Sequence, residues 1–370
     1  MRFDCGPRSI ANGIIHANSP CGGMLSMVSH NLSVFKSSEK SFIQPTHAFP
    51  QSGAISIFKL RIKTDEMRLA VIDLGTNTCN LLIAEQDGKN YHLLYQGKVG
   101  VKLGKGGINK QELTPEAFDR AISALNRHKR TIADIGADRV VTIATSAVRD
   151  ADNNAEFASA LREATGLELT IISGEEEARL IFGGVLLAFG FLPNNSLIMD
   201  IGGGSNEFIQ TQNSEVYWKE SFPLGMARVV ERFPLSDPIL PDERLAIEHW
   251  FDEGMSKLWQ QLNGTAVSRL IGCSGAFDTL ADLIDQTAPG TKARITQDVD
   301  MNDFIRITDE IIRSTKAQRE HMVAMESLRI EMIVPSFILM QLVVKRLKIT
   351  KITQTDFALR EGVLRDWINH

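Results

Sequence analysis

A glycine-rich turn that occurs twice constrains the fold of this chain more than any other feature. The segment Asp73-Leu-Gly-Thr-Asn-Thr-Cys-Asn80 corresponds, position for position, to Asp200-Ile-Gly-Gly-Gly-Ser-Asn-Glu207. Each copy follows an apolar run and precedes another strand-like run, which predicts a strand, a turn and a hairpin in each half of the chain. One such turn alone would be an ordinary connection between strands, whereas two aligned copies indicate a duplicated architecture.

Alternating helix and strand periods surround the two turns and predict an α/β fold. Between the turns we expect helices at 115–133, 155–165 and 174–188 and strands at 139–144 and 167–172. After the second turn we expect helices near 225–233 and 242–262, a strand at 268–272 and a mostly helical C-terminus. A break near 190–195 divides the chain into an N-terminal domain, residues 67–190, and a C-terminal domain, residues 191–370.

The first 66 residues follow a different pattern. They show no sustained period of two or of 3.6, and Met67 stands directly before the first convincing strand. Residues 1–66 therefore predict a disordered leader or a misassigned start. A genuine regulatory or targeting arm is the alternative.

Charge and composition give no indication of a nucleic acid or a membrane as a partner. The 370 residues carry a formal net charge of −5, which provides no general attraction for nucleic acid or a membrane surface. The most apolar stretch, 330–344, is interrupted by Glu331, Pro335 and Gln341, so no membrane span is predicted. The four cysteines show no C-x-x-C spacing, which favours a reduced, cytoplasmic protein.

Both turns have the composition of phosphate-binding loops. Glycine lets backbone N–H groups point together at an anion, and the neighbouring side chains add hydrogen-bond donors. Neither turn carries the lysine of a Walker loop, which excludes a P-loop NTPase. The expected phosphate-binding residues in the turns are Gly75, Thr76, Asn77, Thr78, Gly202, Gly203, Gly204 and Ser205.

Two acidic residues of the second copy suit a metal ion. Asp200 ends a strand and Glu207 lies on the strand beyond the glycines, so both can converge on one face of the hairpin and offer hard oxygen ligands to Mg²⁺. In the first copy Asn80 takes the position of Glu207, which makes the second copy the expected metal side. A simple turn-forming role for Asp200 is the alternative.

Three consecutive glutamates open the helix expected at 174–188. With Ser173 as N-cap, Glu176 completes a capping box, and Glu175 lies four residues before Arg179 and is expected to pair with it. Glu177 has no such local partner, so we assign it the role of general base, which activates a water for attack on phosphorus. A solvated glutamate on the helix face is the alternative.

Two further strand ends carry polar residues. Thr145, Ser146 and Arg149 follow the strand at 139–144, where open α/β sheets place ligands, and are expected to contact phosphate. An ion pair between Arg149 and Asp150 at the surface is the alternative for the arginine. The turn Gly272-Cys-Ser-Gly275 is a weaker candidate, because it could merely let a helix pack closely.

These motifs together resemble those of the exopolyphosphatase and guanosine pentaphosphate phosphatase (Ppx/GppA) family, in its short two-domain form. The resemblance runs from Met67 nearly to the C-terminus. It consists of D-L-G-T-N-T at Asp73, A-T-S-A-V-R-D-A at Ala144, S-G-E-E-E-A-R at Ser173, D-I-G-G-G-S-N-E at Asp200, P-L-G at Pro223, G-C-S-G at Gly272 and L-R-E-G at Leu359.

The resemblance implies two ribonuclease-H-like domains of the actin-like ATPase superfamily with a cleft between them. It also implies a homodimer that uses Mg²⁺ to remove terminal phosphate from inorganic polyphosphate or guanosine pentaphosphate. The family's catalytic glutamate maps onto Glu177, and its metal-linked residues map onto Asp200 and Glu207. Asn80 departs from the His or Arg common in the family, which weakens one expected substrate contact.

Two alternative functions are consistent with the same residues. A phosphotransferase or ATP-driven chaperone of the same superfamily would bind nucleotide through the same turns. A sensor without catalytic activity would bind polyphosphate or an alarmone and signal to a partner, and Asn80 is its only indication in the sequence.

Overall fold

The computed structural model describes residues 67–369, and the predicted leader of residues 1–66 lies outside them. The first half of this part forms β1 (Met67–Leu74), β2 (Thr78–Asp87), β3 (Asn90–Gly100), η1 (Ile108–Lys110), α1 (Pro115–Ile135), β4 (Arg139–Ala144), α2 (Ser146–Arg149), α3 (Asn154–Thr165), β5 (Thr170–Ile171) and α4 (Gly174–Phe189). The second half forms β6 (Ser196–Ile201), β7 (Asn206–Gln212), β8 (Glu215–Phe222), α5 (Met226–Arg232), α6 (Pro241–Gly254), α7 (Ser256–Gln261), β9 (Arg269–Cys273), α8 (Gly275–Asp285), β10 (Gln297–Val299), α9 (Met301–Arg313), α10 (Lys316–Glu320), α11 (Ile333–Leu347), β11 (Ile352–Thr355) and α12 (Leu359–Ile368).

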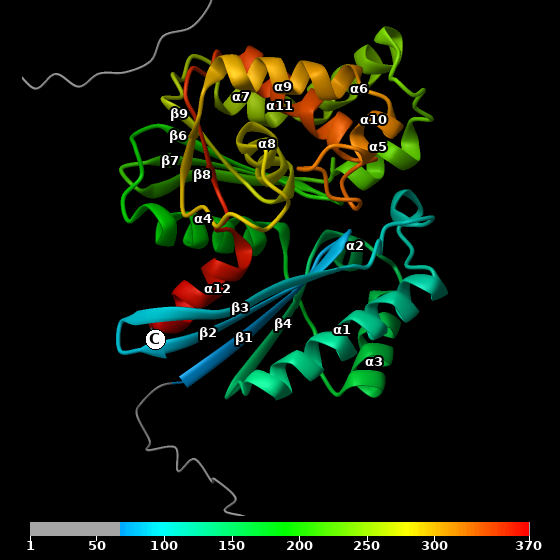
Figure 1. Cartoon of the computed structure of the whole chain (residues 1–370), viewed down its shortest axis with the longest axis vertical. Helices are drawn as coiled ribbons and strands as arrows, with labels where there is room; N and C mark the ends of the chain where they lie inside the picture. Colours follow the sequence, from blue (N-terminus) through cyan, green and yellow to red (C-terminus); the bar gives the residue numbers. More distant parts are fainter. Residues whose placement is uncertain (1–66, 370) are drawn as a thin grey trace, which may run out of the picture. The chain divides into compact units, whose positions relative to one another are not determined.

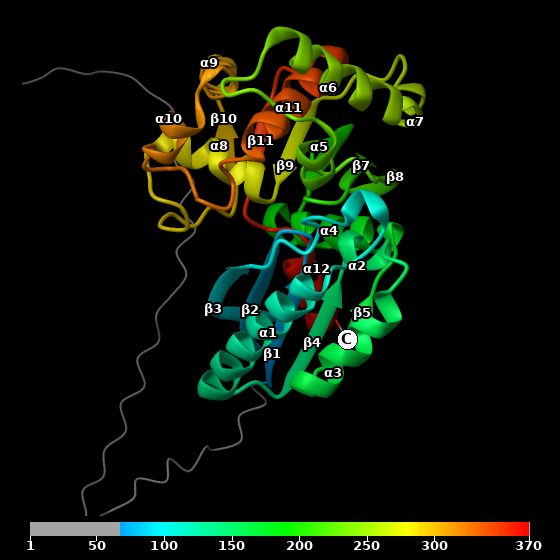
Figure 2. The ribbon, with the colours of Figure 1, turned by 90° about the vertical axis from the view of Figure 1, so that its right-hand side faces the viewer.

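The two sheets share one strand order, as a duplication requires (Figures 1 and 2). The first sheet has the order β3-β2-β1-β4-β5, and the second has β8-β7-β6-β9-β11 with β10 added at its edge. In both sheets the central strand comes first in the sequence. It pairs antiparallel with the strand that follows it on one side, and in parallel with the strand after the first crossover on the other. The hairpin registers also correspond, because Asp73 lies opposite Asn80 and Asp200 lies opposite Glu207.

Helices α1 and α3 cover one face of the first sheet. Thr114 caps α1 by accepting a hydrogen bond from the N–H of Ala117, and Pro115 occupies the first helical position, where its missing N–H costs nothing. Small and apolar residues of α1 then pack against alternate residues of β1 and β2 in one core. The second sheet has its own, larger core, to which α5, α6, α8, α9 and α11 contribute.

Helices α4 and α12 form a pair that joins the two sheets. Helix α12 packs on β1 and β2 of the first sheet, while α4 packs on β7 and β8 of the second. The helices approach so closely that a Cβ atom on Gly184 would lie 1.9 Å from the carbonyl oxygen of Ala358. A Cβ on Gly362 would lie equally close to the carbonyl oxygen of Leu180. Glycine at both positions therefore sets the spacing of this helix pair.

Several details differ from the sequence-based expectations. The strand expected at 167–172 is reduced to β5, and the helix expected at 242–262 is divided at Met255 into α6 and α7. The C-terminal part contains β10 and β11 between its helices. The domain boundary near residue 190 stays a prediction, and α12, which that boundary assigns to the second domain, packs on the first sheet. No helix within residues 67–369 is long and apolar enough to cross a membrane.

Candidate active site

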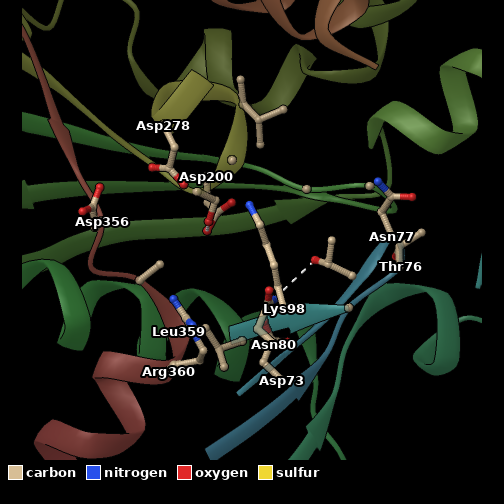
Figure 3. Close-up of a pocket in the computed structure, with 18 of the residues that line it drawn as sticks. Asp73, Thr76, Asn77, Asn80, Lys98, Asp200, Asp278, Asp356, Leu359 and Arg360 are labelled. Carbon is tan, nitrogen blue, oxygen red and sulfur yellow. Dashed lines mark hydrogen bonds between the residues drawn. The ribbon is translucent and has the colours of Figure 1, made fainter. Parts of the chain in front are cut away.

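A polar cavity of about 340 Å³ lies where the two repeated turns meet (Figure 3). This is the usual size of a site for a small ligand. Its walls come from both sheets and from the start of α4, α8 and α12. The predicted site residues that line it are Gly75, Thr76, Asn77, Thr78, Thr145, Ser146, Glu177, Asp200, Gly202, Gly203, Gly204 and Ser205.

The two turns have the same hydrogen-bonded geometry. The N–H of Gly75 donates to the carbonyl of Thr78 at 2.9 Å, and the N–H of Gly202 donates to the carbonyl of Ser205 at 3.0 Å. In both cases this bond closes a tight loop between the central strand and its hairpin partner. The repeat seen in the sequence is therefore a repeat of structure at the level of single hydrogen bonds.

The turns also face each other closely. A Cβ atom on Gly203 would lie 3.0 Å from the Cβ of Thr76, and a Cβ on Gly204 would lie 2.6 Å from the Thr76 hydroxyl and 2.5 Å from the Ser146 hydroxyl. Glycine at 203 and 204 thus leaves room for hydroxyl groups of the first domain next to the second turn. Any larger side chain would push the two turns apart.

Helix α5 fixes the orientation of the second turn. The carbonyl oxygens of Gly202, Gly203 and Gly204 accept hydrogen bonds from the N–H groups of Met226, Ala227 and Gly225, respectively. Within residues 67–369 no backbone hydrogen bond uses the N–H of Gly203 or Gly204. The carbonyl groups of this turn are used by α5, whereas the N–H groups of Gly203 and Gly204 can still donate to an anion.

Glu177 lies buried in the first turn of α4. Ser173 caps this helix by accepting from the N–H of Glu176, as expected, but both Glu176 carboxylate oxygens accept from Arg179, so the predicted capping box does not form. The Glu176 carboxylate pairs with Arg179 at 2.8 Å, so the prediction that Glu175 pairs with Arg179 is wrong. Glu175 instead lies 3.4 Å from Lys219. Arg179 also pairs with Asp366 at 2.7 Å, so its guanidinium is held between Glu176 and Asp366.

Arg149, the last residue of α2, holds the Glu177 carboxylate in place. Its guanidinium lies 2.7 Å from Glu177 Oε2 and also donates to the carbonyl of Ile172. The pair with Asp150 exists as well, at 3.4 Å. Burial and the nearby Glu207 raise the pKa of Glu177 well above its usual range, while the charge of Arg149 opposes this rise.

Asp200 and Glu207 are both buried, but only Asp200 faces the cavity. Asp200 accepts a hydrogen bond from the Ser274 hydroxyl at 2.6 Å, and Glu207 accepts one from the Ser221 hydroxyl at 2.7 Å. Burial raises the pKa of Asp200 to about 7, and the charge of Glu177 adds to this rise. Burial and the charge of Asp200 likewise raise the pKa of Glu207. Glu207 is 1% exposed and is not among the lining residues.

These acidic side chains suit a cation that is only partly bound by protein. Burial also raises the pKa of Asp73, and the charge of Asp73 in turn raises the pKa of Glu177 and of Asp200, so the negative charges around the cavity repel one another. Within residues 67–369 no three His, Cys, Asp or Glu side chains are close enough to enclose a metal ion. Mg²⁺ usually binds through one or two carboxylates and keeps other positions for water and substrate phosphates, so the donors present fit it.

The cavity also contains cations to which the sequence motifs assigned no role. Lys98 projects into it from β3, and Arg329 and Arg360 contribute to its wall (Figure 3). Lys98 lies directly opposite Asn80 in the hairpin, and its amino group pairs with Glu326 at 2.6 Å. Asn80 itself donates to Asp73 at 2.9 Å. The strand pairing of β2 with β3 is the signal that could have identified Lys98.

Comparisons with known proteins agree with this geometry. Residues 82–370 match the model of the Ppx/GppA phosphatase family. The structure of an exopolyphosphatase from Cytophaga hutchinsonii is similar with a TM-score of 0.78 and 36% identity, over 82% of this chain and 98% of that chain. Exopolyphosphatase 1 of Mycobacterium bovis is 27% identical over 300 residues, which cover 80% of this chain and 87% of that protein.

A further relative, with lower sequence identity, has a similar fold. The Ppx/GppA enzyme of Aquifex aeolicus is 24% identical with a TM-score of 0.68, over 81% of this chain and 99% of that chain. The prediction of an α/β fold with two ribonuclease-H-like, actin-like domains is confirmed. By its sequence, its duplicated fold and its structural relatives, the chain belongs to the Ppx/GppA phosphatase family.

Proposed function

We propose that this protein removes the terminal phosphate from inorganic polyphosphate, and that it does so with Mg²⁺. The observation that carries the proposal is the buried Glu177 carboxylate at the wall of a cavity formed by two glycine turns that face each other. Two relatives are named exopolyphosphatases, which supports the same substrate class. Guanosine pentaphosphate, a homodimer and a cytoplasmic location are further parts of the proposal, which the family resemblance suggests.

Each group in the cavity has a defined task in this reaction. Backbone N–H groups of the two turns bind successive phosphates and hold the terminal one near α4. Glu177 accepts the proton of a water whose oxygen forms a bond to the terminal phosphorus, while the bond from that phosphorus to the bridging oxygen breaks. Its raised pKa makes it a stronger base once it is ionised. Arg149 orients the Glu177 carboxylate through their 2.7 Å hydrogen bond.

Asp200 and Glu207 are the residues that would hold Mg²⁺. When bound, the ion supplies positive charge that stabilises the phosphate oxygens during transfer. Asp200 faces the cavity and is the direct ligand in this proposal. Glu207, which is more deeply buried, acts behind it through its charge.

Phosphate release by the full-length chain tests the function. We expect release from polyphosphate with Mg²⁺ and without any nucleotide, and loss of release when the metal is chelated. Formation of ADP that depends on an acceptor would indicate the phosphotransferase alternative instead. Tight polyphosphate binding without release from either polyphosphate or guanosine pentaphosphate would indicate the sensor.

Replacing Lys98 should weaken substrate binding more than turnover. In Lys98→Met the cavity loses a cation that can leave Glu326 and bind a phosphate of the substrate. We expect KM for polyphosphate to rise about 3-fold with kcat almost unchanged. The effect on KM is small because the lysine is partly exposed and its charge is screened by solvent. Steady-state kinetics on polyphosphate give both constants. Lys257→Met, which removes a surface lysine paired with Glu220, is the matched control. An unchanged KM in Lys98→Met would remove Lys98 from the binding site.

A further inference from the structure

Ser274 has a backbone conformation that serine rarely adopts. It connects β9 to α8 with φ 67° and ψ 171°. This combination of positive φ and extended ψ is populated almost only by glycine, since a Cβ atom clashes with the backbone there. The residue is thus held in a strained state by its surroundings.

Ser274 also lacks the hydrogen bond that a serine at the start of a helix usually makes to the helix backbone. It is the N-cap residue of α8, yet its side chain makes no capping hydrogen bond. Ser173, at the start of α4, shows the ordinary arrangement: its φ is −69° and its hydroxyl accepts from the N–H of Glu176. The Ser274 hydroxyl instead donates to Asp200 Oδ2 at 2.6 Å.

Packing explains the glycines beside Ser274, but not the serine itself. A Cβ atom on Gly272 would lie 2.1 Å from the ring of Phe277, and one on Gly275 would lie 1.5 Å from the guanidinium of Arg329. The buried ring of Phe277 therefore requires glycine at 272, and a side chain at 275 would displace the guanidinium of Arg329. At position 274 glycine would relieve the strain, and a serine stands there nevertheless.

We propose that Ser274 is a positioning residue that fixes the Asp200 carboxylate for the cation, and that its strained backbone is retained for this one hydrogen bond. The inference rests on the proposed role of Asp200 in holding Mg²⁺. The Ser274 hydroxyl holds one oxygen of the Asp200 carboxylate, so the other oxygen points in a defined direction. This favours binding of Mg²⁺, because that ion demands near-octahedral coordination.

Two substitutions separate strain from positioning. In the full-length chain, Ser274→Gly removes both the strain and the hydrogen bond, whereas Ser274→Ala removes the hydrogen bond alone. We expect Ser274→Gly to raise Tm by about 2 °C, and Ser274→Ala to leave it unchanged or lower. Both should raise the Mg²⁺ concentration for half-maximal rate about tenfold, the usual effect of losing a hydrogen bond to a charged group.

A second readout does not depend on catalysis. The increase in Tm that Mg²⁺ alone causes should be smaller in both variants than in the unchanged protein, since it reports metal binding directly. Thr315→Gly is the matched control, because Thr315 caps α10 in the ordinary way with φ −76°. It should lower Tm without altering the response to Mg²⁺.

Each outcome decides the inference. A Ser274→Gly variant that is more stable and keeps the normal response to Mg²⁺ would show that the serine positions nothing. A Ser274→Gly variant with a Tm no higher than that of Ser274→Ala, which also lacks the hydrogen bond, would show that the backbone is not strained. If the unchanged protein releases no phosphate, the proposed function fails, while the order of Tm values and the shifts caused by Mg²⁺ still decide the role of Ser274.

Discussion

Glu177→Gln is expected to lower kcat for polyphosphate hydrolysis by about 10²- to 10⁴-fold, the usual loss when a general base is removed. The amide keeps the size of the side chain and can still meet Arg149, so substrate binding and the response to Mg²⁺ should persist. Stability should not fall. Burial and the charge of Glu207 raise the pKa of Glu177 in the folded protein. At a pH above the ordinary pKa of a glutamate, ionising this side chain therefore lowers the free energy of unfolding. The neutral amide of glutamine avoids this cost.

Glu176→Gln is the matched control for this experiment. Glu176 is the preceding residue on the same helix turn, is about 40% exposed and pairs with Arg179. We expect turnover close to that of the unchanged protein and a loss of stability below about 1 kcal/mol. Equal turnover in Glu177→Gln and the unchanged protein would move the base elsewhere, and a large loss in Glu176→Gln would point to that residue first.

Gly184→Ala is expected to destabilise the protein by about 2–3 kcal/mol, at the upper end for an overpacked site. The new methyl group would lie 1.9 Å from the carbonyl oxygen of Ala358, a backbone atom that cannot turn aside. Helices α4 and α12 must then separate, which disturbs the contacts between α12 and the first sheet. Chemical denaturation of the metal-free protein measures the change in the free energy of unfolding.

The adjacent glycine provides the control. A Cβ atom on Gly183 would lie 3.4 Å from the Cα of Gly362, which is ordinary van der Waals contact. Because alanine favours helix over glycine by about 1 kcal/mol, Gly183→Ala should leave stability unchanged or raise it slightly. Similar effects at the two positions would contradict the close approach of the helices at Gly184.

The features that the sequence predicted well are local ones. The turn residues at 73–80 and 200–207 determine the tight loops, and the hairpin registers follow from them. The position of Glu177 could be inferred because Ser173 fixes the start of α4, so the direction of each glutamate follows from helical geometry. The assignment of roles to the site residues stays a prediction.

The features that the sequence did not predict depend on contacts between distant segments. Strand β11 has only the residues Ile352–Thr355, which is too short for a clear period, and its pairing with β9 defines it. Arg149, the last residue of α2, lies beside Glu177 in the first turn of α4, although no local sequence pattern connects them. The same holds for Lys98, whose position in the cavity depends on the pairing of β2 with β3.

The contact between α12 and the first sheet has a consequence for the synthesis of the protein. Strands β1 and β2 leave the ribosome before the whole of the second sheet, whereas Leu364 of α12, which covers Leu69, Val71 and Leu82, is made after it. Until then this apolar face lacks its native cover. The nascent chain therefore carries an aggregation-prone surface until α12 has been made, and a chaperone that shields it would increase the yield of folded protein.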